Sequence, residues 1–357
     1  HNGRGESAKM KKHNTKNFTI HYSLFTVRCS RGFTITELMV AIAITAIAMA
    51  AVYSTFIVQQ RSFVVQDQVA ETQASSKIAS NIITNDLRMA GHGYPIDESP
   101  SINGFTDIID VSGESGLNGG PDAITLVGGF RQVATLAAAT IVGNSQISIT
   151  YSGSTSFNLL NRDNLSIDGI SFAIIPPGGC TLSAAGECLD SGPITLDRGL
   201  SKAFPVGRPV YLIEDVTYQL ALANGNNCND APAGTTCLTR TVAGGGAGNV
   251  NTIASNIDDL QFAYAVDTDD DNEIDDRNTS FCFDPGDYLS PPLPPNSRVL
   301  AVRLNLLAST ANEDPTLAAG TKPYFNTGIV LENNTTADTD RLRRRIWSME
   351  SALRNPR

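Results

Sequence analysis

Carboxylates crowd one short stretch of the sequence, VDTDDDNEIDD, at residues 266–276. Asp267, Asp269 and Asp271 alternate with other residues, and Asp275 follows four positions later. Like charges this close repel one another unless a cation neutralises them, and Ca²⁺ prefers the hard oxygens of carboxylates and carbonyls. The stretch therefore predicts a calcium-binding loop, with a solvated acidic turn as the alternative.

The spacing resembles the first part of an EF-hand calcium loop, whose ligands stand at positions 1, 3, 5, 7 and 9. The residues at these positions, the seventh offering its backbone carbonyl, are Asp267, Asp269, Asp271, Glu273 and Asp275. Asn272 takes the position of the usual glycine and can turn through the left-handed region. Asn278 replaces the bidentate glutamate of position 12. We therefore expect a weak structural site suited to extracellular calcium, and no helix–loop–helix sensor.

Four of the six cysteines form two closely spaced pairs. Cys180 and Cys188 bracket one loop rich in small and polar residues, and Cys228 and Cys237 bracket another. These pairs predict local disulfides that form in an oxidising compartment. Zinc is the alternative, but no CxxC occurs and such spacings suit a zinc knuckle poorly. Cys282 is left without an expected partner.

Histidine is too scarce to support most catalytic constellations. Of the four histidines, only His92 lies beyond the basic N-terminal region. A catalytic triad, a Cys-His dyad or a histidine-based zinc site would depend on that residue alone. The acidic residues cluster in the loop described above rather than at separate strand ends. We therefore expect no enzyme activity.

Charge is distributed unevenly along the 357 residues. Residues 1–32 contain seven Lys or Arg and one acid, so the remainder contains 26−7=19 basic and 36−1=35 acidic residues, a net charge of −16. A basic head before an acidic body is typical of a chain with a cytoplasmic head and an exported body. The acidic body argues against nucleic-acid binding, which needs a basic surface.

A membrane-length apolar segment follows the basic head. Phe33–Val58 contains one charged residue, Glu37, and would span roughly 39 Å as a helix. A secretory signal would have a shorter apolar core and a cleavage site after it. An ordinary single-span anchor explains neither the carboxylate near its start nor Gly32 just before it.

The segment Gly32-Phe33-Thr34-Ile35-Thr36-Glu37-Leu38 resembles the prepilin peptidase site of type IV pilins and type II secretion pseudopilins. The resemblance implies that the peptidase cuts after Gly32 and methylates the new amine of Phe33. It also implies that the Glu37 carboxylate meets the N-terminal amine of a neighbouring subunit during assembly. Such a pair would make a carboxylate in hydrocarbon tolerable and would set the register between subunits.

The remaining sequence predicts an α+β fold, in which a long pilin helix packs on a mostly antiparallel β domain. Residues 59–90 contain no Pro or Gly and continue the helix to a Gly-rich stop. We therefore expect a cleaved leader at 1–32, a helix at 33–90 with a transmembrane first half, and a β-rich periplasmic or extracellular domain at 91–357. The expected strands are Ala123–Val127, Ile141–Tyr151, Leu165–Ile175, Pro209–Leu222, Leu238–Val242, Ile257–Val266, Ser297–Leu307 and Arg343–Met349.

Further segments resemble the PilW group of minor pilins, which is related to the pseudopilin GspJ. They are Leu87–Gly91, Asp122–Leu126, Phe262–Asp271 and Arg343–Trp347. The resemblance implies a minor pilin that enters the inner membrane and then joins the tip or priming complex of a pilus. Its implied partners are other minor pilins, the major pilin and the prepilin peptidase/methyltransferase. A type II secretion pseudopilin and a tip adhesin are the alternative functions.

Overall fold

The computed structural model divides into two compact units, residues 1–61 and 62–357. The structure describes residues 34–95, 101–102, 104–111, 121–151, 159–160, 163–183, 186, 188–189, 192–222, 228, 235–243, 249–275, 288–289, 293–294, 297–314 and 341–354. Phe33 and the leader, including Gly32, lie outside these residues, as does Cys282.

Helix α1 runs from Ile35 to Met89 and crosses the boundary between the two units. In the first unit nearly every described side chain is exposed. An 18-residue window of the helix has a mean hydropathy of 2.2, and none of that window is buried. The hydroxyls of Thr45 and Thr55 donate to the carbonyl oxygens of Ala41 and Ala51, so neither needs a partner outside the helix. By length and composition this part of α1 can cross a bilayer.

The second part of α1 packs against the sheets through a face of mostly small side chains. Its buried residues are Ser76, Ala79, Ser80, Ile83, Thr84 and Leu87. The hydroxyls of Ser76 and Ser80 each donate at 2.8 Å to the carbonyl four residues earlier, so their burial leaves no polar group unsatisfied. Gly91 stops the helix with a φ of 73°, and its N–H donates to the Val127 carbonyl at 2.8 Å.

An eight-stranded antiparallel sheet is organised around the long strand β8 (Pro209–Leu222). Its main path is β1-β2-β8-β5-β6; β9 also pairs with β8, β10 with β9, and β4 with β2. The other bounds are β1 Ile109–Asp110, β2 Ile124–Leu136, β4 Ile149–Tyr151, β5 Asn164–Ile167, β6 Ser171–Ile174, β9 Thr236–Ala243 and β10 Asn249–Ser255. A second, two-stranded sheet joins β3 (Gln146–Ile147) and β7 (Ile194–Thr195).

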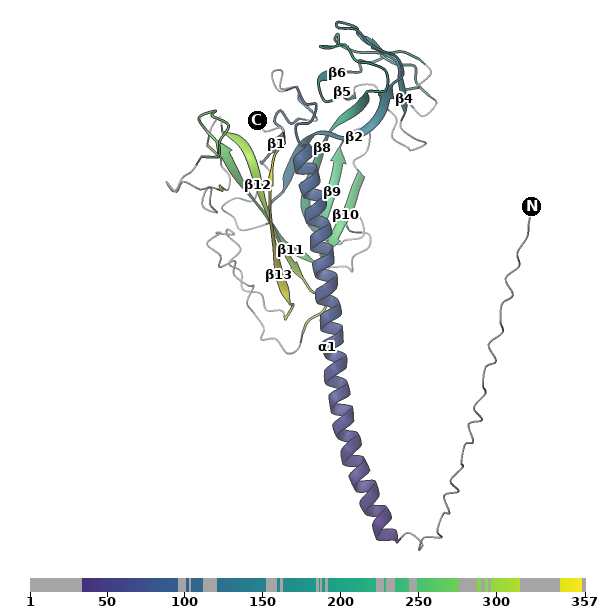
Figure 1. Ribbon diagram of the computed structural model, residues 1–357, viewed down its shortest axis with the longest axis vertical. Helices are drawn as coiled ribbons and strands as arrows, with labels where there is room; N and C mark the ends of the chain where they lie inside the picture. Colours follow the sequence, from purple (N-terminus) through teal and green to yellow (C-terminus); the bar gives the residue numbers. More distant parts are fainter. Residues whose placement is uncertain are drawn as a thin grey trace, which may run out of the picture. The chain divides into compact units, whose positions relative to one another are not determined.

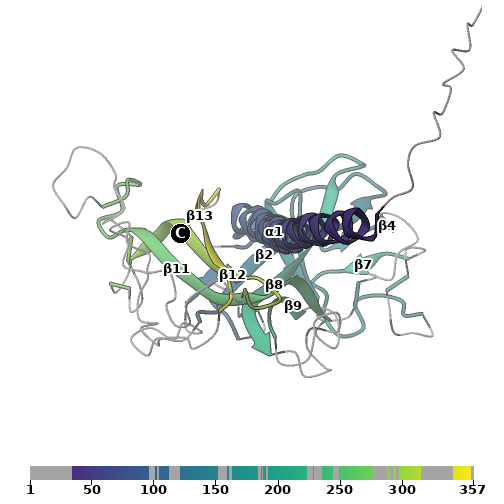
Figure 2. The ribbon, with the colours of Figure 1, turned by 90° about the horizontal axis from the view of Figure 1, so that it is seen from below.

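A three-stranded antiparallel sheet has the order β11-β12-β13. Its strands are β11 Ile257–Asp267, β12 Arg298–Ser309 and β13 Arg344–Ala352. Figure 1 shows this sheet on one side of the second part of α1 and β9 on the other, and Figure 2 shows β8 and β9 beneath the helix. The main hydrophobic core lies between the helix and the eight- and three-stranded sheets, and a second core lies among β2 to β8. The expected fold class, a long helix packed on antiparallel sheets, is confirmed.

Two of the expected strands are wrong as continuous elements. The range Ile141–Tyr151 contains an exposed turn at Gly143 (φ 79°) and only then the short strands β3 and β4. The range Leu165–Ile175 is a hairpin, because Asp168 and Gly169 both adopt positive φ and reverse the chain between β5 and β6. Strands β1, β7 and β10 were not expected, since the first two contain two residues each and the third is largely polar.

The buried carboxyl group of Glu214 in the large sheet predicts a dependence of stability on pH. Glu214 of β8 is 3% exposed, and its Oε1 accepts from Nη2 of Arg131 on β2 at 2.5 Å. Burial raises the pKa of Glu214 from 4.5 to about 7, while attraction to Arg131 acts in the opposite direction. The folded chain therefore retains a proton that the unfolded chain loses between these values. Stability should fall as the pH rises from 4.5 through 7, by roughly 3 kcal/mol.

Glu214→Gln should remove this contribution. We expect the free energy of unfolding of the variant to rise relative to that of the unchanged chain between pH 4.5 and 8, measured by chemical denaturation in detergent. Glu71→Gln, which alters an exposed acid on α1, is the control and should follow the unchanged chain. Parallel pH profiles for the unchanged chain and the Glu214 variant would contradict the assignment.

Candidate functional site

Glu37, the expected assembly residue, lies in the first turn of α1 and takes part in a capping box. Its carboxylate accepts the backbone N–H of Thr34 at 3.0 Å and the hydroxyl of Thr34 at 2.9 Å. In return, the Thr34 hydroxyl accepts the Glu37 N–H at 3.3 Å. This reciprocal arrangement satisfies donors that the start of a helix leaves without partners. The carboxylate is therefore held at the beginning of the apolar helix, a few positions after the expected processing residues Gly32 and Phe33 in the sequence.

The acidic loop begins at the last residue of β11. Asp267 is 1% exposed, and its carboxylate accepts the backbone N–H groups of Asp269, Asp270 and Asn272 at 3.2, 2.7 and 3.0 Å. Asn272 adopts a φ of 67°, the left-handed conformation that a tight turn requires at this position. The Asp267 side chain thus organises the loop around itself.

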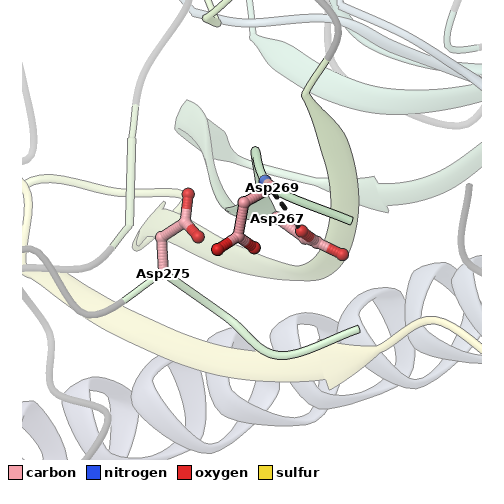
Figure 3. A group of neighbouring side chains, drawn as sticks. All are labelled: Asp267, Asp269 and Asp275. Carbon is pink, nitrogen blue, oxygen red and sulfur yellow. Dashed lines mark hydrogen bonds between the residues drawn. The ribbon is translucent and has the colours of Figure 1, made fainter. Parts of the chain in front are cut away.

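Three of the expected ligands come together. One carboxylate oxygen from each of Asp267, Asp269 and Asp275 lies within 4.8 Å of the other two, and Figure 3 shows these side chains together. This group could hold a metal ion. Asp271 is not part of it: its carboxylate accepts the Glu273 N–H at 2.7 Å. Glu273 was expected to contribute only its backbone carbonyl.

Arg298 is a partner of the loop that the sequence patterns did not reveal. Antiparallel pairing places it opposite Asp267, and its Nη2 donates to Asp267 at 2.7 Å and to the Asn272 side chain at 2.6 Å. Burial would raise the pKa of Asp267, but the backbone donors and Arg298 hold it below its ordinary value. The pKa of Asp269 is raised, chiefly by repulsion from Asp271. Arg298 therefore neutralises the buried end of the loop and leaves excess negative charge at its exposed end.

The two cysteine pairs are bonded in the structure. The Cα atoms are 5.5 Å apart for Cys180 and Cys188 and 6.1 Å apart for Cys228 and Cys237. The first bond lies against the second core, where the hydroxyl of Tyr151 donates to the carbonyl of Cys188. Both bonds close short loops, so they hold local structure rather than joining distant parts of the body.

A partly buried network of hydrogen bonds and charges joins α1 to the large sheet. Like the contact between Arg298 and the acidic loop, this network was not predicted from the sequence. One oxygen of Asp86 accepts the Tyr218 hydroxyl at 2.5 Å and Nε of Arg240 at 2.8 Å. Tyr218 and Arg240 are cross-strand partners on β8 and β9. Burial, followed by the charge of Asp86, raises the pKa of Tyr218, so its hydroxyl keeps the proton that it donates. Because Asp86 lies within one turn of the end of α1, the network fixes that end on the sheet.

Two family models match the chain. The prokaryotic N-terminal methylation motif matches residues 27–53, which include Gly32, Phe33 and Glu37. The type IV pilus-assembly protein W family matches residues 226–355, which include β9 to β13 and the acidic loop. Comparison with curated proteins and with solved structures finds no match.

These matches agree with an exposed apolar helix at the start of a membrane-anchored prepilin. A pilus-assembly family is structural, which agrees with the expectation that the chain is not an enzyme. Over residues 226–355 the chain is thus similar to the type IV pilus-assembly protein W family, and at residues 27–53 it carries a prokaryotic N-terminal methylation motif.

Proposed function

We propose that the chain is a minor pilin, made as a prepilin that spans the inner membrane once. Residues 1–32 form a cytoplasmic leader, residues 33–90 the pilin helix, and residues 91–357 the domain outside the membrane. The peptidase cuts after Gly32 and methylates the amine of Phe33. The processed subunit then leaves the membrane for the pilus, where it joins the tip or priming complex with other minor pilins and the major pilin.

The observation that carries this proposal is the single carboxylate at the start of the exposed apolar helix. A charge in hydrocarbon costs several kcal/mol unless it is paired. The N–H and hydroxyl groups of Thr34 supply hydrogen bonds to the Glu37 carboxylate but do not neutralise its charge. An ammonium group on a neighbouring subunit would neutralise it. The capping box accounts for the hydrogen bonds of Glu37, whereas alignment with a neighbouring subunit also accounts for its negative charge.

Mass spectrometry of the N-terminal peptide tests the processing step. Protein is extracted from membranes and, separately, from filaments sheared off the cell surface. We expect a peptide that begins at Phe33 and carries one methyl group, in both fractions. An uncut leader, or a cut after the apolar segment, would refute the pilin assignment. The processed peptide in membranes alone, together with a secretion defect on deletion, would favour a secretion pseudopilin.

We also propose that the acidic loop binds Ca²⁺ as a structural ion. The three carboxylates of Asp267, Asp269 and Asp275 supply hard oxygen ligands within reach of one another. The excess negative charge lies at the exposed end of the loop, where a cation can enter and relieve the repulsion between Asp269 and Asp271. Weak binding suits a domain outside the cell membrane, where calcium is abundant.

Calcium should stabilise the folded chain. With a Kd near 1 mM, 10 mM Ca²⁺ should raise the free energy of unfolding by about 1.4 kcal/mol. Thermal denaturation in EDTA and in Ca²⁺ measures the change, and Asp269→Asn should abolish it. The control is Asp67→Asn, which changes an exposed acid on α1 and should keep the full response. Equal responses from both variants, or no response from the unchanged chain, would refute the site.

A further inference from the structure

His92 lies where the chain leaves α1, and backbone hydrogen bonds hold it in place. Its N–H donates to the Met89 carbonyl at 3.0 Å, and its own carbonyl accepts the N–H of Gly129 on β2 at 2.9 Å. The preceding residue, Gly91, donates to the Val127 carbonyl of the same strand. The exit from α1 is thus joined to β2 by two backbone hydrogen bonds, one of them at His92 itself.

The imidazole ring of His92 packs against two further elements. It meets the ring of Tyr211 on β8 edge to face, with centroids 4.7 Å apart and an interplanar angle of 88°. It also lies against Gly169 in the turn between β5 and β6, where an added methyl group would come within 2.4 Å of Cε1 and 2.9 Å of Nε2. The ring therefore fits because residue 169 has no side chain, and it links the end of α1 to both elements.

One nitrogen of this ring has no hydrogen-bond partner. Nε2 is closed to solvent and is not hydrogen-bonded to any residue that the structure describes. A neutral imidazole can carry its hydrogen on Nδ1 and leave Nε2 as a bare acceptor. An imidazolium carries a hydrogen on both nitrogens, so protonation would create a buried, charged donor without an acceptor. The geometry therefore favours the neutral ring.

Charged groups near the ring act in opposite directions. Burial lowers the pKa of His92 below its ordinary value, and repulsion from Arg354, which follows β13, lowers it further. Asp168 in the β5–β6 turn raises the pKa, but by less. Asp168 is paired with Arg208 at 3.2 Å, and this second positive charge offsets its attraction for a proton on the ring. The surroundings of His92 thus resist its protonation.

We propose that His92 forms an acid-sensitive contact that holds the exit from α1 against β8 and the β5–β6 turn. While the ring is neutral the contact is closed; a protonated ring must move its Nε2–H towards water or an acceptor, which loosens the junction. The unfolded chain takes up the proton near pH 6.5 and the folded chain only at lower pH. The stability that this contact contributes is therefore present above pH 6.5 and is lost as the pH falls below it.

The sign of this effect is opposite to the one expected for Glu214, which separates the two contributions. The contact is also independent of processing at Gly32 and of calcium, because none of its groups belongs to the leader or to the acidic loop.

NMR of the imidazole Cε1–H group tests whether the folded chain resists the proton. The full-length chain is kept in detergent micelles, and the three histidines of residues 1–32 are replaced by glutamine, so that His92 alone is observed. We expect its titration midpoint to lie below that of the same chain unfolded in urea. Arg354→Gln should raise the midpoint and Asp168→Asn should lower it. A folded midpoint at or above the unfolded one would overturn the proposal.

Hydrogen exchange measured by mass spectrometry tests whether protonation loosens the junction. The full-length chain is compared at pH 7.5 and pH 5 with His92→Phe, which keeps an aromatic ring beside Tyr211, and with His92→Gln. For peptides covering residues 86–95 and 124–132, the ratio of the exchange rate in the unchanged chain to that in each variant should rise several-fold at the lower pH. For peptides from β12 the ratio should stay constant.

Each ratio compares two chains at one pH, so the intrinsic dependence of exchange on pH cancels. The change of the ratio between the two pH values also removes any constant loss of stability in a variant. A ratio that stays constant in the junction peptides for both variants would overturn the proposal. So would a rise that is equally large in β12, because the acid sensitivity would then belong to the whole domain rather than to the end of α1.

Discussion

Replacing Asp86 by alanine is expected to lower the free energy of unfolding by about 3–5 kcal/mol, a large fraction of the stability of a typical domain. Asp86 is the acceptor for both Tyr218 and Arg240, which lie on adjacent strands of the large sheet. Tyr218 is fully buried, so its hydroxyl would lose its acceptor where water cannot replace it. Arg240, whose side chain is 22% exposed, would lose its opposite charge. Chemical denaturation of the full-length chain measures the loss.

Two further variants separate the network from the helix itself. Asp67→Ala changes an exposed acid on the same helix and should alter stability by less than about 0.5 kcal/mol. Asp86→Asn keeps an oxygen acceptor but loses the charge, so its effect should be intermediate. If Asp86→Ala and Asp67→Ala destabilise the chain equally, the Asp86 network does not hold the helix on the sheet.

The network illustrates what the sequence leaves undetermined. Runs of β-branched residues predicted the strands β8, β9, β11, β12 and β13. This was possible because strand propensity and alternating burial are local properties of the sequence. Pairing between strands is not local. Nothing in the sequence shows that Tyr218 stands opposite Arg240, or that the end of α1 places Asp86 over both. The Asp168-Gly169 pair was a local signal for a hairpin, but the apolar run around it was interpreted as one strand.

The buried face of α1 was also hard to predict. The helix was predicted from the absence of Pro and Gly in residues 59–90, which does not show which face is buried. Three polar residues, Ser76, Ser80 and Thr84, occupy much of that face. Hydroxyls that donate to the preceding turn can be buried at low cost, so hydrophobic periodicity understates the contact. The apolar side chain of Ile78, in the same part of the helix, is 54% exposed.

In the acidic loop, the spacing of the aspartates along the sequence was enough to predict that some of their carboxylates lie close together. Asp267, Asp269 and Asp275 are close in sequence, so a single tight turn suffices to gather them. Arg298 escaped notice because it lies 31 residues beyond Asp267, and only the register between β11 and β12 brings the two together. Local ligand sets can be inferred from sequence, whereas the distant group that tunes their charge requires the fold.

Glu37→Gln is expected to remove the subunit from filaments while leaving the prepilin processed and anchored. Glutamine can replace glutamate in a capping box, so the contacts with Thr34 and the start of the helix should persist. The negative charge that would pair with a neighbouring ammonium is lost. Removing one member of a desolvated charge pair costs about 2–5 kcal/mol, which corresponds to incorporation lowered roughly 30-fold or more.

Co-expression of the variant with the unchanged chain gives the sharpest measurement, because both compete for the same filaments in one cell. Mass spectrometry of the N-terminal peptides gives their ratio in membranes and in sheared filaments. Thr45→Val is the control: it removes a polar group from the same apolar helix with little change in shape, and it should be incorporated normally. Because the glutamine variant keeps the helix cap, a deficit confined to it would assign the effect to the charge. An equal ratio of variant to unchanged peptide in both fractions would instead mean that Glu37 only caps the helix. The contact between subunits would then have to come from other residues.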